Sequence, residues 1–299
     1  MVQSVAQGLD AWAEMVPENR MVMGLGAGLI ARDTHRDSAQ AEAEAGLTLL
    51  FPAGARPSAG NVELVLSGAD DRKRPEVRKQ SEVRKQIAAR ISSQRARAEG
   101  WLEILASGLT FDLTGLEPGP ALSAPEARHF FGLSRDADRF EFEAIAIFPG
   151  PHLAGAGAMV PVVRAMAALA SALALELGAL AVCWEPAGSW MDVQYFSRIV
   201  EGWSAGGAFP ALGLTGIERT ADGGVESDGL AFFIGQELRV EARSGEAAAD
   251  TVKLAARVID HLVNHGAIAK REALVGPGGE ALLAEPSGDG KFVQVWRDG

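Results

Sequence analysis

The sequence predicts an α+β protein with a mixed β-sheet, a β-α-β unit, packed helices and one long basic helix. Three observations carry this prediction. The composition, 47% hydrophobic and 22% charged over 299 residues, is that of a globular chain with room for one large domain or two modest ones. A strand-like run, an apolar helix and a second strand-like run follow one another between Arg139 and Trp184, the order of a β-α-β unit. Turn signals and an amphipathic helix continue the pattern beyond Trp184.

Residues 1–70 are expected to form an N-terminal α/β segment. The glycines Gly24, Gly26 and Gly28 lie inside an apolar run with no helix signal directly after them. We therefore interpret them as close-packed backbone, with a dinucleotide-binding loop as the alternative. The expected elements are strands at Met21–Ile30, Leu47–Phe51 and Asn61–Leu66, a short helix at Ser38–Ala45 and a loop at Pro52–Gly60.

Residues 71–107 are expected to form the long basic helix. Ten Lys and Arg residues lie between Arg72 and Arg97, against two Glu, and apolar residues recur every three, four or seven positions from about Glu76 to Ala106. We interpret this helix as solvated. The alternative is a nucleic-acid contact, for which the candidate residues are Arg78, Lys79, Arg84 and Lys85. Because the chain as a whole carries a net charge of −11 and base-stacking aromatics are missing here, we do not expect nucleic acid to be the partner.

Residues 108–299 are expected to form the α+β core domain, which could be continuous with residues 1–70. Arg139–Phe148 has the composition of a strand, Pro161 opens an apolar helix that stops at Gly178, and Ala179–Trp184 follows as a buried strand. This β-α-β unit favours a parallel pair. The later elements are helices at Asp192–Trp203 and Ala247–Asn264, a hairpin turn at Ala221–Gly224, and strands at Leu212–Arg219, Gly229–Ile234, Leu238–Arg243, Ala281–Ala284 and Phe292–Trp296.

The most unusual local sequence follows the predicted strand that ends at Trp184. Open α/β sheets bind ligands at the carboxyl ends of their strands, and the residues here mix aromatic with polar side chains. We expect Trp190 and Tyr195 to be more accessible than Trp184, which continues the strand. The competing interpretation, which we favour for the cluster as a whole, is an aromatic corner that seals the sheet against the next helix. The candidate ligand- or partner-binding residues are Trp184, Glu185, Ser189, Trp190, Asp192 and Tyr195.

The cysteine and histidine residues were considered for catalysis and metal binding. Cys183, the single cysteine, lies in an apolar strand without an adjacent histidine, so we expect a buried hydrophobic residue rather than a nucleophile. His261 and His265 are four residues apart on a predicted helix, but no third ligand is marked, so they are weak metal candidates only. His129 and His152 lack defined partners in the sequence. No catalytic motif is visible, and no cofactor is predicted.

From about Phe140 onward, the order of features resembles an uncharacterised bacterial family known as domain of unknown function 4261. The matching features are the Ala/Leu-rich helix that leads into Ala181–Trp184, then Pro186–Gly188, the helix with Tyr195-Phe196, the strand Leu212–Ile217, the turn Asp228–Leu230 and the helix ending at His265-Gly266. The resemblance covers somewhat over half of the chain and implies an α+β domain. It implies no activity.

These observations favour a soluble, bacterial-type cytoplasmic protein that acts as a non-catalytic binding or interaction module. Its partner would be a protein or a small molecule; the oligomeric state is left open. No signal peptide is visible in the first twenty residues, and the longest apolar stretch is too short to span a bilayer, so we expect no membrane association. The alternatives are a hydrolase or transferase with its site between Trp184 and Tyr195, and a nucleic-acid-associated protein that acts through the basic helix.

Overall fold

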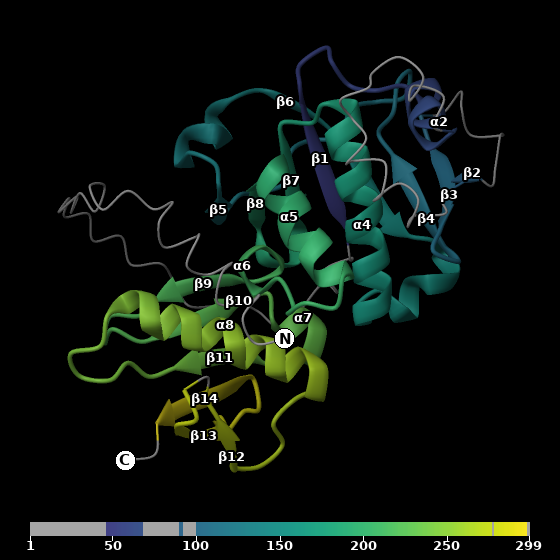
Figure 1. Ribbon diagram of the computed structural model, residues 1–299. Helices are drawn as coiled ribbons and strands as arrows, with labels where there is room; N and C mark the ends of the chain where they lie inside the picture. Colours follow the sequence, from purple (N-terminus) through teal and green to yellow (C-terminus); the bar gives the residue numbers. More distant parts are fainter. Residues whose placement is uncertain (1–45, 68–89, 92–99, 277, 298–299) are drawn as a thin grey trace. The chain divides into compact units, whose positions relative to one another are not determined.

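The computed structural model describes residues 46–67, 90–91, 100–276 and 278–297, which form two mixed β-sheets with helices packed against them (Figure 1). The α+β prediction is therefore confirmed. The larger sheet has eight described strands, which are, in order across the sheet, β2 (Arg90–Ile91), β3 (Leu102–Ala106), β4 (Leu109–Thr114), β6 (Phe142–Pro149), β1 (Leu47–Pro52), β7 (Ala181–Trp184), β8 (Ser189–Asp192) and β5 (His129–Phe131).

Strand β1 lies at the centre of the larger sheet and pairs antiparallel with both β6 and β7. Strands β6 and β7 therefore run in the same direction, as the β-α-β prediction requires, but they are not hydrogen-bonded neighbours. The predicted parallel pair is corrected in this respect, because an apolar strand from the N-terminal part of the chain lies between its two members. Residues before position 70 and residues after position 108 thus share one sheet.

Helix α4 (Val160–Leu177) makes the crossover between β6 and β7. Pro161 lies in its first turn, and Gly178 ends it in the left-handed conformation (φ 73°), which glycine adopts without strain. By length and composition this helix could cross a membrane, so the expectation that the longest apolar stretch is too short to span one is wrong. Ten of its residues, however, are buried in the structure, so it packs as an interior helix of the fold.

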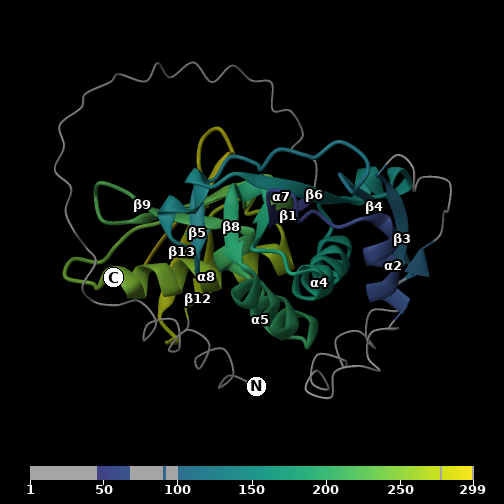
Figure 2. The ribbon, with the colours of Figure 1, turned by 90° about the horizontal axis from the view of Figure 1, so that it is seen from above.

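Helices α2 (Ala59–Ser67) and α5 (Val193–Ser204) pack beside α4, and Figure 2 shows the three helices along one side of the larger sheet. The core lies between these helices and the inward side chains of the strands, such as Leu47, Ile104 and Ile147. A smaller apolar cluster, which includes Leu50, Cys183 and Trp190, lies on the opposite face of the sheet.

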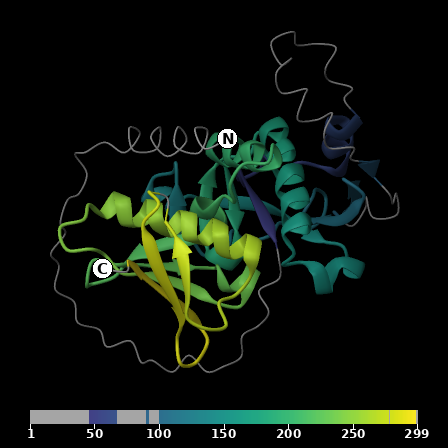
Figure 3. The same cartoon turned by 60° about the horizontal axis from the view of Figure 1, so that its bottom comes forward.

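The second sheet has six described strands and carries helix α8 (Ala248–His265), which crosses it in Figure 3. The alternating burial of β11 and β14 shows that α8 covers the apolar face, while Arg239 and Gln294 lie on the other face. The strands, in order, are β12 (Glu272–Val275), β13 (Ala281–Pro286), β14 (Phe292–Arg297), β11 (Glu237–Val240), β10 (Val225–Asp228) and β9 (Gly216–Arg219).

The prediction of a long basic helix is wrong for the residues of this segment that the structure describes, 90–91 and 100–107. Leu102, Ile104 and Ala106 are buried in alternation, which is the period of a strand, and β3 turns at Ser107-Gly108 into β4. Gly100 has φ 72°, and a Cβ there would lie 2.3 Å from the carbonyl oxygen of Leu116, so the chain makes a close turn where the helix was expected. The segment that contains Arg78, Lys79, Arg84 and Lys85 lies outside the described residues.

Other predicted elements changed type or position. Asn61–Leu66 belongs to helix α2 rather than to a strand, and the expected strand Gly229–Ile234 contains the short helix α7 (Ala231–Ile234). The expected strand at Leu212 begins only at Gly216, after the short helix α6 (Ala211–Leu214). The predicted hairpin turn does join two strands, β9 and β10. The predicted elements at Met21–Ile30 and Ser38–Ala45 lie outside the described residues.

Candidate functional site

Trp184 and Trp190 lie on opposite faces of the larger sheet, although they are only six residues apart. In the β7–β8 hairpin, Trp184 is opposite Ser189 and Cys183 is opposite Trp190, so the two indoles alternate across the pleat. Trp184 is fully buried and Trp190 is only 3% exposed. The expectation of an accessible Trp190 in a shared aromatic wall is therefore wrong.

The space at the carboxyl end of β7 is filled by the protein itself. The rings of Phe232 and Phe233, from α7, lie 5.3 and 6.0 Å from that of Trp184, the first edge-on and the second stacked. An open sheet would offer this position to a ligand. Here helix α7, which connects two strands of the second sheet, occupies this position. A local sequence pattern could not predict this, because α7 is distant from β7 in the sequence.

The remaining predicted site residues make structural contacts. Asp192 is the N-cap of α5 and accepts hydrogen bonds from the backbone N–H groups of Gln194 and Tyr195, both at 2.9 Å. The Tyr195 hydroxyl donates to the carbonyl oxygen of Leu212 at 2.7 Å, and burial raises the pKa of this phenol well above its usual value. The exposed Glu185 accepts from the Thr48 hydroxyl at 3.1 Å. In the described part of the chain, the six predicted residues do not line one pocket.

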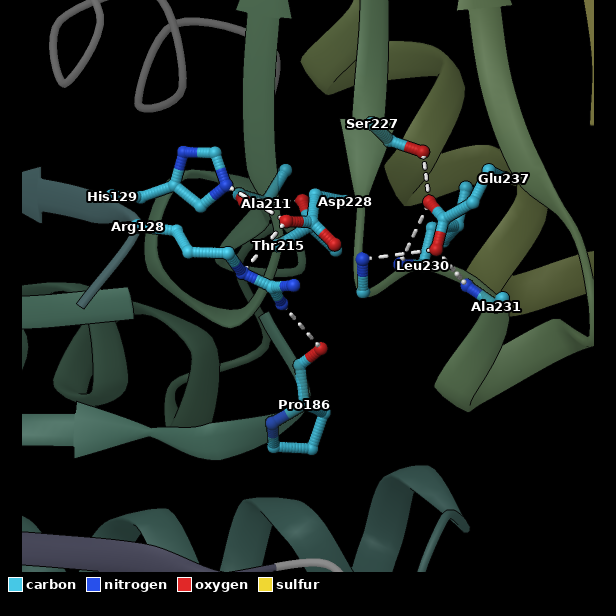
Figure 4. A network of polar contacts seen from close by, with 11 residues as sticks. Arg128, His129, Pro186, Ala211, Thr215, Ser227, Asp228, Leu230, Ala231 and Glu237 are labelled. Atoms are coloured by element: carbon cyan, nitrogen blue, oxygen red, sulfur yellow. Dashed lines mark hydrogen bonds and ion pairs between the residues drawn. The ribbon is translucent and has the colours of Figure 1, made fainter. Parts of the chain in front are cut away.

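A polar network joins the edge of the larger sheet to the second sheet (Figure 4). The Oδ2 atom of Asp228, at the end of β10, lies 3.1 Å from His129 Nε2 and 3.1 Å from Arg128 Nε. His129 is 8% exposed, and its ring lies directly against the backbone of Gly216 in β9. Arg128 also lies 3.5 Å from the carbonyl oxygen of Pro186. The network fixes β5 to β9 and β10.

Glu237 organises the other half of this network in Figure 4. Its carboxylate accepts from the backbone N–H groups of Gly229, Leu230 and Ala231 at 2.9–3.1 Å, and from the Ser227 hydroxyl. Three successive N–H groups aimed at one carboxylate form an anion-binding turn. Because the protein's own Glu237 occupies it, this turn stabilises the fold rather than binding a ligand.

The network places a serine, a histidine and an aspartate close together, since Ser189 is opposite His129 in the parallel β5–β8 pair. In a hydrolase triad the outer Nε2 atom of the histidine faces the serine, while Nδ1 faces the aspartate. Here Asp228 holds Nε2, and the Ser189 hydroxyl is buried without a described hydrogen-bond partner. Asp228 therefore contacts the nitrogen that would face the serine in a triad. We interpret the contacts of His129 as structural, because they hold the two sheets together.

Two facing carboxylates were missed by the sequence analysis. Glu103 in β3 is directly opposite Asp112 in β4. Burial and the neighbouring Glu103 raise the pKa of Asp112. His152 lies nearby, with Nε2 2.6 Å from the Thr110 hydroxyl. The Ser107-Gly108 turn could have predicted this register, because both carboxylates lie at equal distance from it.

A chain of aromatic rings leads from the surface to the buried Trp190. Phe140 is 69% exposed, and its ring makes an edge contact with Phe142 at 6.4 Å. Phe142 makes a similar contact with Trp190 at 5.7 Å, and Phe130 lies 6.1 Å from Trp190 on another side. We call the surface formed by Phe140 and the half-buried Phe142, with Trp190 beneath, the Phe140 surface. Because Phe140 is exposed and continues into a buried aromatic cluster, this surface is a candidate interaction site.

His261 and His265 lie next to each other on α8, and Cys183 lies in the interior. The rings of His261 and His265 stack at 4.1 Å, and His265 Nδ1 lies 2.8 Å from the His261 carbonyl oxygen. Burial and the neighbouring His265 lower the pKa of His261. The described residues contain no set of three metal-ligating side chains, so the pair stays a two-ligand candidate. Cys183 is fully buried, as expected.

Comparisons of the chain with protein-family models, with curated proteins and with solved structures each find no match. The fold and the contacts described above define a two-sheet α+β protein whose sheets are joined by the polar contacts of His129 and Arg128 with Asp228. The resemblance to the domain of unknown function 4261 family stays a prediction.

Proposed function

We propose that this protein is a soluble, cytoplasmic, non-catalytic binding module that docks a partner protein at the Phe140 surface. The observation that carries the proposal is the exposure of Phe140 together with its edge contact to Phe142. Burial of an exposed aromatic ring contributes strongly to protein association, and aromatic residues are enriched among those that dominate interface energies.

The anchoring of Phe140 supports the proposal. Its backbone N–H donates to the carbonyl oxygen of Ala137 at 3.3 Å, which closes the short 3-10 helix Arg135–Arg139. The base of the surface is held by Trp190 in the apolar cluster around Leu50 and Cys183. Fixing the backbone at Phe140 before binding reduces the conformational entropy that is lost when a partner covers the ring.

The test uses Phe140→Ala with Met159→Ala as its matched control. Met159 is also a large, exposed apolar residue, at 57%, but it lies at the start of α4 outside this aromatic chain. Proteins retained by the wild type from a lysate of the native host would be identified, purified and titrated against the wild type and the two variants. We expect Phe140→Ala alone to weaken binding, by about tenfold or more, with both variants as stable as the wild type. Equal binding by the two variants would overturn the proposal.

A second candidate function, hydrolase or transferase chemistry, is favoured by the facing carboxylates of Glu103 and Asp112. A carboxyl group whose pKa is raised and which lies beside a second carboxyl group is an arrangement that supports general acid–base catalysis. Its test is hydrolysis of generic ester, phosphoester and glycoside substrates by the wild type and by Asp112→Asn. An activity that Asp112→Asn abolishes, while Thr114→Val retains it, would favour this candidate over the binding module.

A third alternative, nucleic-acid binding through Arg78, Lys79, Arg84 and Lys85, rests on residues outside the described part of the chain. A salt-dependent affinity for DNA or RNA that falls on replacement of these residues by Gln would support it.

A further inference from the structure

The charge around the Phe140 surface bears on the kind of partner that can cover it, if the proposed docking function holds. Among the described residues the chain has 26 Asp and Glu against 16 Lys and Arg. This excess of negative charge attracts basic partners and repels acidic ones, and it acts beyond the residues in direct contact.

The local charges point in the same direction. Glu141, next to Phe140, is exposed, and so is Glu126 in the segment that precedes β5. The nearby cations Arg56 and Arg128 are already paired, with Glu143 at 3.9 Å and Asp228 at 3.1 Å. Arg135, at the start of the short 3-10 helix, is an exposed cation in the same segment.

We infer that the partner docked at the Phe140 surface is a polypeptide segment that presents an apolar anchor flanked by basic residues. The anchor covers Phe140 and Phe142, while the flanking cations face Glu141 and the acidic surface around it. A second copy of this chain fits less well, because two acidic surfaces would face each other.

The test uses two synthetic peptides with the same Leu and Phe anchors, one flanked by Lys and the other by Glu. Their affinities are measured for the wild type, Phe140→Ala, Met159→Ala and Glu141→Lys at low and at physiological salt. We expect the Lys peptide to bind about tenfold tighter than the Glu peptide, with an advantage that shrinks as salt rises. Phe140→Ala should remove most of the binding, Glu141→Lys should reduce the advantage, and Met159→Ala should change neither.

The outcomes separate this inference from the docking function on which it rests. If both peptides depend on Phe140 but bind equally well, the docking function stands and the basic partner is refuted. If the Lys peptide binds Phe140→Ala as tightly as the wild type, both are refuted, because the attraction is then general. If neither peptide binds but neutral phospholipid vesicles bind in a Phe140-dependent way, the basic peptide is refuted as the partner, and a membrane surface is the partner instead. If the protein self-associates and Phe140→Ala abolishes the association, the partner is a second copy of this chain and the basic peptide is refuted.

Discussion

A Cβ atom at Gly216 would lie 2.1 Å from Nε2 of His129. The imidazole ring therefore packs directly against the backbone of β9 at Gly216. The same nitrogen lies 3.1 Å from Oδ2 of Asp228. The two sheets meet at this point, because His129 belongs to the larger sheet while Gly216 and Asp228 are paired residues of β9 and β10 in the second sheet.

Gly216→Ala should consequently destabilise the protein. The new methyl group must displace the ring, which strains the packing and breaks the contact with Asp228, so we expect a loss of about 2–4 kcal/mol in the free energy of unfolding. Denaturant unfolding would measure it. Gly155→Ala is the control, because a Cβ there meets no atom within 4 Å. A neutral Gly216→Ala variant would show that the two sheets do not meet through this contact.

Trp190→Ala and Trp184→Ala should destabilise the protein to a similar extent. Both side chains are buried, so each truncation leaves a cavity and should cost roughly 3–5 kcal/mol. Urea unfolding of the two variants gives the comparison. A loss below about 1 kcal/mol for Trp190→Ala alone would indicate that this indole lies at the surface, as an exposed ligand-binding residue would.

Cys183 should react with a thiol reagent only after denaturation. Burial, and to a smaller extent the negative charge of Glu185, raises the pKa of this thiol, so little of the reactive thiolate forms near neutral pH. Labelling kinetics with and without denaturant would measure this. Rapid, stoichiometric labelling of the folded protein would contradict the buried setting of the residue.

His261 should make stability depend on pH in the acidic range. Its pKa is lowered in the folded protein, so the folded state favours the neutral ring and the unfolded state binds the proton more readily. This contribution is complete above the unfolded value of about 6.5 and is lost as the pH falls toward the lowered folded value. His261→Gln should flatten the dependence of unfolding free energy on pH there. His265→Gln should reduce it in part, because it removes the neighbouring imidazole that helps to lower the pKa of His261.

Elements with a long, uninterrupted pattern were predictable from the sequence. Helices α4 and α8 and the strands β1, β6 and β7 lie within a few residues of their predicted positions. The hairpin β3–β4 was not predicted, because Leu102 and Leu105 also satisfy a helical spacing and lie next to a basic stretch. Alternating burial of Leu102, Ile104 and Ala106 requires β4 as a neighbour, and that pairing depends on residues beyond the helical window.

The candidate site depended still more on tertiary structure. The sequence predicted correctly that Cys183 is buried, and it marked Trp190, which lies beneath the Phe140 surface. It could not place Trp190 away from Trp184, because one residue of register in the β7–β8 hairpin decides the face.

The sequence by itself determined the α+β class, the crossover helix and the apolar strands, because hydrophobic periodicity and turn residues act over short distances. Tertiary structure alone decided that β1 lies between β6 and β7 and that α7 fills the end of β7. It also brought His129 to Asp228 and Glu103 to Asp112. The physical reason is that these contacts join distant segments, whose meeting depends on sheet order and register rather than on local propensity.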